Sequence, residues 1–380
     1  MVIAEEDLPE WLRRAVARGD SRDTLTQGRA LACLAAAVLP ADPVRGRALL
    51  DRGRDLSLAD RSFPIRDLVL AELAHAAAEG GDRAKARELV LASPDEGRRT
   101  AEFLKLMRST APDGVPPLAD EAETLLWRLP ADDRAALPAA ELATLLAPHD
   151  PRRSRALVDY AEGILPSVVD PDRAARVLAE LARASTALGD TAQAFARIDR
   201  SAAINVGHPD DLALLLTELA ETAVAAGDRD LAVLLLEEAR TLLADAPDPY
   251  MRFLCSLEVA RSARIAGDDR TAREALREAE LTAPAVEDPY QQALAWTELA
   301  RLAPSEDFVP RALALLPSIG FPGFEIEVLR RLPAPVHDHL SRALSSGPWP
   351  VCLIAALLAF PDPAPEVLLR IADDLLTTAL

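Results

Sequence analysis

Several residue types are scarce in this chain of 380 residues, and each scarcity excludes a class of protein. Aromatic residues make up only 4% of it, whereas alanine and leucine dominate the apolar half. A β-sandwich needs β-branched and aromatic residues, so this composition favours thin, closely packed helices. The three cysteines, Cys33, Cys255 and Cys352, lie far apart without a Cys-x-x-Cys pair, which argues against a disulfide framework and favours a cytoplasmic protein.

Long hydrophobic runs are missing as well. The longest uncharged apolar run, WPVCLIAALLAF at residues 349–360, is too short to span a bilayer. The N-terminus has no basic region followed by an apolar core, so it does not look like a signal peptide. We expect the apolar run to be a buried terminal helix covered by residues 364–380, with a docking face for a partner helix as the alternative. No membrane association is expected.

Positive charge is in short supply. Lysine occurs only at Lys85 and Lys105, acidic residues outnumber Lys and Arg by 61 to 42, and the net charge is −19. Such a chain repels nucleic acids and anionic lipids at long range. The net charge therefore predicts that nucleic acid is not a partner.

The common catalytic motifs are absent too. The sequence has no Gly-x-x-x-x-Gly-Lys loop, no Gly-x-Ser-x-Gly elbow and no His-Glu-x-x-His. His337 and His339 flank Asp338, but positions i and i+2 do not face each other on a helix, so we expect no metal site there. We predict a protein that is not an enzyme and that has no cofactor and no metal.

What the sequence does contain is a repeated helical hairpin. In LTELAETAVAAGDRDLAVLLLEEA, residues 216–239, apolar residues form one helix face on each side of a Gly-Asp pair at 227 and 228. Glycine suits the left-handed residue that ends a helix, and aspartate suits the N-cap of the next helix. Similar pairs begin at Gly81, Gly189 and Gly267, and the last three pairs are spaced by 38 and 40 residues.

A second marker has the same period. Proline opens the first helix of each unit at Pro171, Pro209, Pro249 and Pro289, at spacings of 38, 40 and 40 residues. Proline is favoured at the first helical position because its missing N–H would be unpaired there. Two markers with one period of 38–40 residues predict an array of stacked helical hairpins.

The apolar positions of these units resemble a known repeat family. The segment AWTELARLA at residues 295–303 has the Trp, Leu and small-residue spacing of a tetratricopeptide repeat (TPR), and Pro284 ends one unit where that family often has proline. The chain thus resembles a TPR protein, although its period exceeds the family's roughly 34 residues; HEAT-like repeats are an alternative. The resemblance implies an all-α fold, an α-solenoid of stacked antiparallel helical hairpins.

The strength of the repeat varies along the chain and suggests four regions. Residues 1–97 hold an N-terminal helix and TPR-like hairpins, 98–169 divergent helical repeats, 170–317 well-formed repeats, and 318–380 degenerate repeats with a C-terminal cap. We expect these regions to form one continuous superhelix.

In such a superhelix the first helices line the concave side. Positions 10, 6 and 3 residues before each glycine are expected to point into a groove, and they include Arg183, Glu221, Arg261, Arg264, Arg301, Thr217, Leu257 and Thr297. One interpretation is a groove for an acidic peptide or a C-terminal carboxylate, which arginine can bind through two hydrogen bonds. The simpler interpretation is that the arginines form solvated pairs with Glu218, Glu258 and Glu298.

We therefore predict a cytoplasmic scaffold or adaptor. It would bind a partner protein or peptide, with acidic residues or a free C-terminus, through the concave face. One alternative is a regulatory sensor that binds a small molecule or a short signalling peptide in the same groove. A helical-repeat enzyme is the third and least favoured class.

Overall fold

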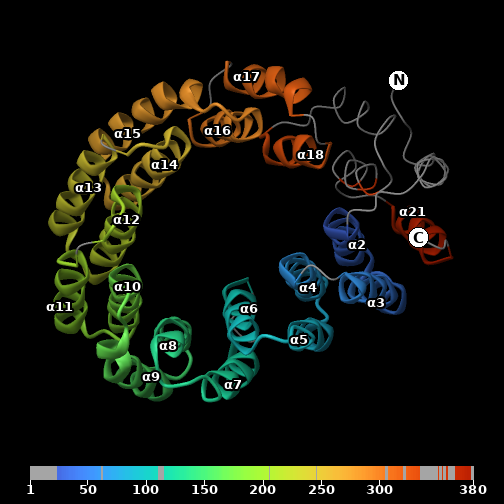
Figure 1. Ribbon diagram of the computed structural model, residues 1–380, viewed down its shortest axis with the longest axis horizontal. Coiled ribbons are helices and arrows are strands. Elements are labelled where there is room, and N and C mark those ends of the chain that lie inside the picture. The colour runs from blue at the N-terminus through green and yellow to red at the C-terminus, as the bar shows by residue number, and fades with distance from the viewer. Residues whose placement is uncertain are drawn as a thin grey trace. The chain divides into compact units, whose positions relative to one another are not determined.

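The computed structural model describes residues 24–60, 63–109, 115–204, 206–244, 246–303, 307–319, 322–333 and 364–377, with the single residues Pro350, Leu353 and Leu357. Within these ranges the secondary structure is helical and no strand occurs (Figure 1). The prediction of an all-α, TPR-like array of stacked antiparallel hairpins is confirmed. Among the helices described, none is long and apolar enough to cross a membrane.

The chain divides into two compact units. Unit 2 is continuous from Phe103 to Leu315, whereas unit 1 combines Met1–Glu102 with Leu316–Leu380. The helices of unit 2 are α7 (Val115–Leu126), α8 (Asp133–Leu146), α9 (Pro151–Ile164), α10 (Pro171–Ala187), α11 (Thr191–Ala202), α12 (Pro209–Ala226), α13 (Arg229–Leu243), α14 (Pro249–Ala266), α15 (Asp269–Thr282), α16 (Pro289–Leu302) and α17 (Phe308–Leu315). Short 3-10 turns follow α9 and α15 at Leu165–Ser167 and Ala283–Ala285.

Unit 1 contains helices from both ends of the chain. They are α2 (Thr24–Val38), α3 (Pro43–Ala59), α4 (Phe63–Glu79), α5 (Arg83–Leu91), the 3-10 turn Leu316–Ser318, α18 (Pro322–Arg331) and α21 (Pro365–Thr377). Helix α6 (Glu96–Ser109) runs across the boundary between the units.

The helix caps define each hairpin of unit 2. Helices α10, α12, α14 and α16 begin with the predicted prolines. Gly227 and Gly267 end α12 and α14 in the left-handed conformation, with φ of 96° and 78°. Asp228 then caps α13 by accepting the Leu231 N–H at 2.9 Å. The two sequence markers therefore coincide with the ends of real helices, because each supplies the backbone chemistry that a helix end needs.

Replacing Gly227 by alanine is expected to lower the free energy of unfolding by about 1 kcal/mol, since an L-residue is strained in the left-handed conformation. The matched control is Gly163→Ala, near the end of α9, which is expected to stabilise by about 0.5–1 kcal/mol because alanine is the better helix former. A Cβ added at either position meets no atom within 4 Å, so packing does not explain a difference. Urea unfolding of both variants checks this; equal effects would contradict it.

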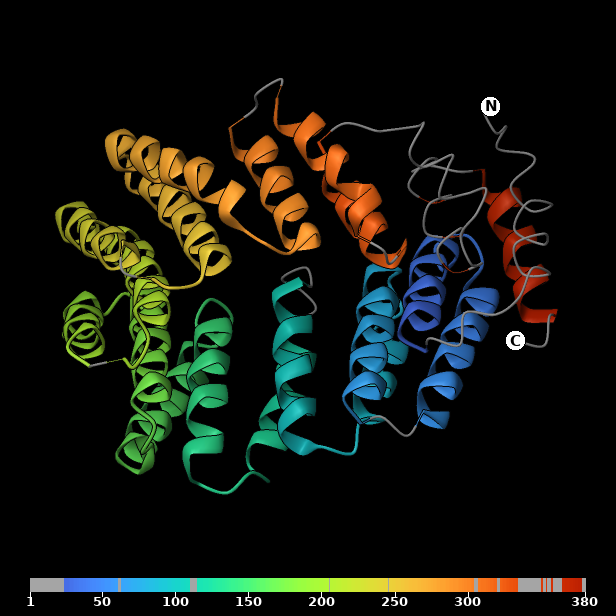
Figure 2. The same cartoon turned by 45° about the horizontal axis from the view of Figure 1, so that its top comes forward.

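The hairpins of unit 2 form two layers (Figure 1, Figure 2). We call α8, α10, α12, α14 and α16 the A layer, and α9, α11, α13, α15 and α17 the B layer. Each A helix packs against the B helix of its own hairpin and against the neighbouring A helices. Within unit 2 the A layer lies on the inner side of the bend that the hairpins follow (Figure 1).

Small and aliphatic side chains fill the space between the layers. In the centre of unit 2, Leu216, Leu219 and Ala220 of α12 and Leu236 and Ala239 of α13 are almost completely buried. Alanine at such contacts lets neighbouring helices approach closely. The scarcity of aromatic residues therefore reflects a core of thin, tightly stacked helices.

In unit 1 the C-terminal helix α21 packs against α2 and α3. The sequence led us to expect that residues 364–380 cover the apolar run at 349–360. That run lies outside the described residues except for Pro350, Leu353 and Leu357. The contact that the structure shows joins segments as much as 328 residues apart, and no local sequence pattern reports such a contact.

Candidate functional site

The A layer of unit 2 carries the residues that the sequence singled out. Arg183 lies in α10, Glu221 in α12, Arg261 and Arg264 in α14, and Arg301 in α16. They occupy similar positions in successive hairpins because the repeat period places one A helix beside the next.

The arginines are held by glutamates of the same layer. Arg183 contacts Glu180 at 2.7 Å and reaches the next hairpin at Glu218, 3.2 Å away. Two further arginines each pair with a glutamate one helical turn earlier: Arg261 with Glu258 at 2.7 Å, and Arg301 with Glu298 at 3.4 Å. Arg264 instead donates to the Leu302 carbonyl at 3.1 Å. The pairs with Glu218, Glu258 and Glu298 are those that the simpler interpretation named. The Arg261–Glu258 pair is exposed on both sides, and such a pair contributes only about 0–1 kcal/mol.

Three predicted positions do not lie on an exposed surface. Thr217, Leu257 and Thr297 are 4%, 3% and 0% exposed. The hydroxyl of Thr217 donates to the Ala213 carbonyl at 2.7 Å, and Thr297 makes the equivalent bond to Ala293. The expectation that these side chains point into a groove is corrected for a physical reason. Each A helix is packed by neighbours on both sides, so more of its circumference is buried than a two-faced helix would bury.

A row of glutamates accompanies the arginines. Each A helix carries one glutamate followed by Leu-Ala or Val-Ala: Glu141, Glu180, Glu218, Glu258 and Glu298. Sequence reasoning named the last three only as partners for arginines and missed the first two. The sequence did contain a signal for them, since the Glu-Leu-Ala or Glu-Val-Ala motif recurs with nearly the period of the hairpins. Carboxylates therefore repeat along the A layer, and α10, α14 and α16 each place an arginine one helical turn after the glutamate.

Burial and crowding act on these carboxylates. Loss of solvent raises the pKa of Glu141, with the nearby Glu180 adding to the effect and Arg108 opposing it. Loss of solvent also raises the pKa of Glu218, where Arg183 opposes and Glu180 adds. Half of the Glu218 side chain is exposed to solvent, 50%, compared with 21% for Glu141. Glu141 is therefore the group on which a pH dependence is best tested.

The effect of Glu141 on stability is expected to depend on pH. Because folding raises its pKa above the value near 4.3 of an unfolded chain, the folded protein binds this proton more tightly. The contribution of Glu141 is thus fully present below the unfolded pKa and is lost as pH rises through the folded pKa. We expect the stability of the wild type relative to Glu141→Gln to increase from pH 7 to pH 5. Chemical unfolding at both pH values measures this, and a fall in that relative stability would refute it.

A hollow of about 300 Å³ lies between α10 and α12 on this surface. Its lining residues are Arg183, Thr186, Ala187, Glu221, Thr222 and Ala225. Thr186 and Thr222 donate their hydroxyl protons to the carbonyls of Ala182 and Glu218, each at 3.0 Å, so their remaining capacity is to accept. The hollow thus combines aliphatic walls with acceptor oxygens and one guanidinium group.

The described residues contain no group of three or more His, Cys, Asp or Glu side chains placed to hold a metal ion. The triplet at His337–His339 lies outside them. Burial raises the pKa of the Cys255 thiol to about 12, with Asp210 and Asp211 nearby, so this cysteine is an inert packing residue.

No protein-family model matches the chain. No curated protein matches its sequence. Several solved structures match the chain along most of its length. One is a Rap protein complexed with Competence and Sporulation Factor, at a TM-score of 0.38 and 11% identity, covering 98% of this chain and 100% of that one. Another is a circular tandem repeat protein, at a TM-score of 0.29 and 19% identity, covering 93% of this chain and 95% of that one. A third is the human IFIT1 dimer with m7Gppp-AAAA, at a TM-score of 0.29 and 14% identity, covering 98% of this chain and 96% of that one.

One prediction from the sequence is contradicted by these comparisons. The net charge led us to exclude nucleic acid as a partner, yet the human IFIT1 dimer among these structures is solved with m7Gppp-AAAA. The exclusion was wrong because net charge describes the field far from the molecule and does not fix the potential at any one surface. A charge of −19 therefore does not remove this class of ligand.

Proposed function

We propose that the chain is a binding scaffold whose A layer in unit 2 holds a partner protein or peptide. The observation that carries the proposal is the hollow between α10 and α12, which lies beside the charged rows of the same layer. A site on packed helices is held more rigidly than a site on loops, which suits stoichiometric binding. Binding would occur by exchange of the exposed Glu–Arg pairs for contacts with the partner.

The energetics support such an exchange. The pairs of Arg261 and Arg301 are weak because these side chains are 46% and 54% exposed. A partner that covers them removes water and strengthens each charged contact to about 1.5–3 kcal/mol. A preformed row of such groups needs little reorganisation on binding, which lowers its cost.

The test is affinity capture from native cells with mass spectrometry. We compare the wild type with a variant in which Arg183, Arg261, Arg264 and Arg301 are all alanine. The matched control replaces four exposed arginines of the B layer: Arg155, Arg229, Arg273 and Arg277. Both variants change the net charge equally, so only the position of the charge differs. Circular dichroism and thermal unfolding verify that each variant is folded.

We expect a partner that the wild type and the B-layer variant retain and that the A-layer variant loses, with affinity lowered at least tenfold. Equal retention by all three proteins would reject the A layer as the binding surface. If only a small molecule accompanies the protein, and it raises the melting temperature of the wild type but not of the A-layer variant, the sensor alternative replaces the scaffold.

A further inference from the structure

Helix α21 has one strongly apolar side. Leu368, Ile371, Ala372 and Leu375 are buried, whereas Asp373 on the opposite side is exposed. The helix has only 13 residues. An isolated helix of that length is marginal in water, so most of its stability must come from the surface on which it packs.

The last turn of α21 is electrostatically unfavourable by itself. It contains Asp374, with Asp373 directly before it, and no basic residue. The C-terminal end of a helix has partial negative charge, and carboxylates there destabilise it, whereas cations stabilise it. The helix therefore lacks, in its own sequence, the positive charge that its C-terminal end needs.

Helix α3 supplies that charge. Arg45 binds Asp373 through both carboxylate oxygens, from Nε at 2.7 Å and from Nη2 at 3.2 Å. Arg52, seven residues further along the same face, donates to the Leu375 carbonyl. One arginine thus neutralises the acidic turn, and the other satisfies a carbonyl that a helix end leaves free.

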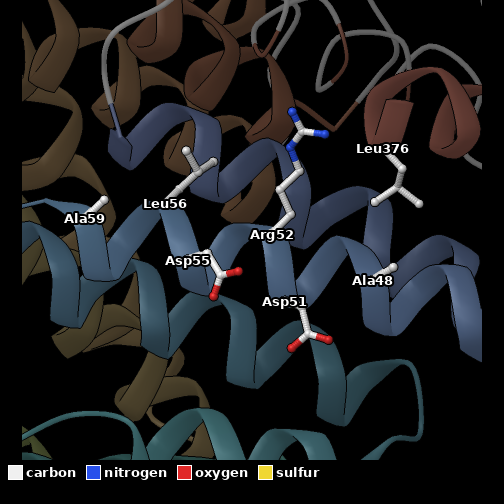
Figure 3. Close-up of a pocket in the computed structure, with 7 residues that line it drawn as sticks. All are labelled: Ala48, Asp51, Arg52, Asp55, Leu56, Ala59 and Leu376. Atoms are coloured by element: carbon white, nitrogen blue, oxygen red, sulfur yellow. The ribbon is translucent and has the colours of Figure 1, made fainter. Parts of the chain in front are cut away.

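The surface between the two arginines suits a close helix contact. Ala48 lies between them at the spacing of one helical turn and has a short side chain. Figure 3 shows Leu376 of α21 on the same side of α3 as Ala48 and Arg52. These three residues line a hollow of about 570 Å³ that continues along α3 past Leu56 to Ala59. Leu376 is the only residue of α21 that lines this hollow in the described part of the chain, and Asp51 and Asp55 of α3 also line it.

We propose that the α2–α3 hairpin is a binding surface for an amphipathic helix with an acidic last turn, and that α21 is its releasable ligand within the same chain. Docking and folding of α21 are one event, because the helix depends on α3 for both its apolar contacts and its C-terminal charge. Release of α21 exposes the α3 face that it packs on, with Arg45 still paired to Asp42, to a helix of the same chemistry from another protein. This proposal does not depend on the A layer of unit 2.

Hydrogen exchange of the full chain tests the charge contact. Arg45→Glu and Asp373→Arg are each expected to raise the exchange rates of the α21 amides about fivefold, with α12 as the internal reference. The double variant, Arg45→Glu with Asp373→Arg, restores opposite charges and is expected to return exchange close to the wild-type rate. Wild-type rates in both single variants would overturn the proposal, as would a double variant that exchanges faster than either.

A peptide experiment tests release directly. Leu375→Asp buries a charge under α21 and is expected to detach it while leaving α3 unchanged. A labelled synthetic peptide of residues 364–377 should then bind the Leu375→Asp chain, measured by fluorescence anisotropy, and bind the wild type at least tenfold more weakly because its site is occupied. The same peptide with Asp373→Arg should bind the Leu375→Asp chain less tightly. Failure of the peptide to bind a folded Leu375→Asp chain would overturn the proposal; if that chain does not fold, the exchange experiment decides.

Discussion

Replacing Glu162 by alanine is expected to lower the free energy of unfolding by about 2–3 kcal/mol, because it leaves the charge of Arg197 buried without its partner. Arg197 of α11 is 5% exposed, and its Nη2 lies 2.6 Å from Glu162 of α9. Breaking a fully buried pair costs about 3–5 kcal/mol, and the partial exposure of Glu162, 35%, reduces the effect.

The pH dependence of this effect has a defined sign. Burial by itself would raise the pKa of Glu162, but hydrogen bonds from Arg197 and Arg200 outweigh it and hold that pKa below its ordinary value. The stabilisation is therefore present above the unfolded pKa, near 4.3, and is lost as pH falls through the folded pKa. Urea unfolding at pH 7 and at progressively lower pH should show the difference between wild type and Glu162→Ala shrinking.

Two further variants separate the buried charge from the lost contact. Arg197→Met combined with Glu162→Ala removes both charges and is expected to recover part of the stability, since an apolar side chain of similar volume replaces the guanidinium group. Arg200→Ala removes the exposed partner of Glu162, 51% exposed, and is expected to cost less than 1 kcal/mol. If Arg200→Ala were as damaging as Glu162→Ala, burial of Arg197 would not be the cause.

The substitution Leu219→Ala is expected to cost about 3 kcal/mol, the largest effect of a single truncation in unit 2 that we predict. Leu219 is fully buried in α12, within the cluster that joins α10, α12, α13 and α14. Truncation removes apolar burial and leaves a cavity, because neighbouring A helices are fixed by their own contacts and cannot collapse into it.

The matched control is Leu234→Ala in the neighbouring helix α13. Its side chain is the same, but Leu234 is 64% exposed. Its truncation is expected to change stability by no more than about 0.5 kcal/mol. Thermal and urea unfolding of both variants measure the comparison, and similar losses at the two positions would contradict the assignment of the core.

The hairpins could be predicted because the residues at the helix ends are of types that favour those ends. Pro209 begins α12, Gly227 ends it, and Asp228 caps the start of α13. These three residues therefore mark three helix ends. The sequence predicted less well which side chains of each A helix are buried and which face solvent. Thr217 and Leu257 were assigned to the groove, yet they are buried, because a helix in an array packs against neighbours on three sides.

The repeat period also placed two of the singled-out residues side by side. Arg183 and Glu221 do line the hollow between α10 and α12. Glu141 and Glu180 were missed, although they repeat like the arginines, because acidic residues in a chain of charge −19 do not stand out. The pairing of Arg45 with Asp373 could not be predicted, since nothing local connects residues separated by 328 positions.

The division of the chain has a consequence for the order of events during synthesis. Unit 2 is one uninterrupted stretch, so its hairpins can complete their contacts as soon as residue 315 has left the ribosome. The α2–α3 hairpin is made before unit 2, whereas α21, which packs on it, is made after unit 2. The α2–α3 hairpin therefore waits for α21 while the whole of unit 2 is synthesised, and during that interval a chaperone or a helix from another protein can occupy the α3 face.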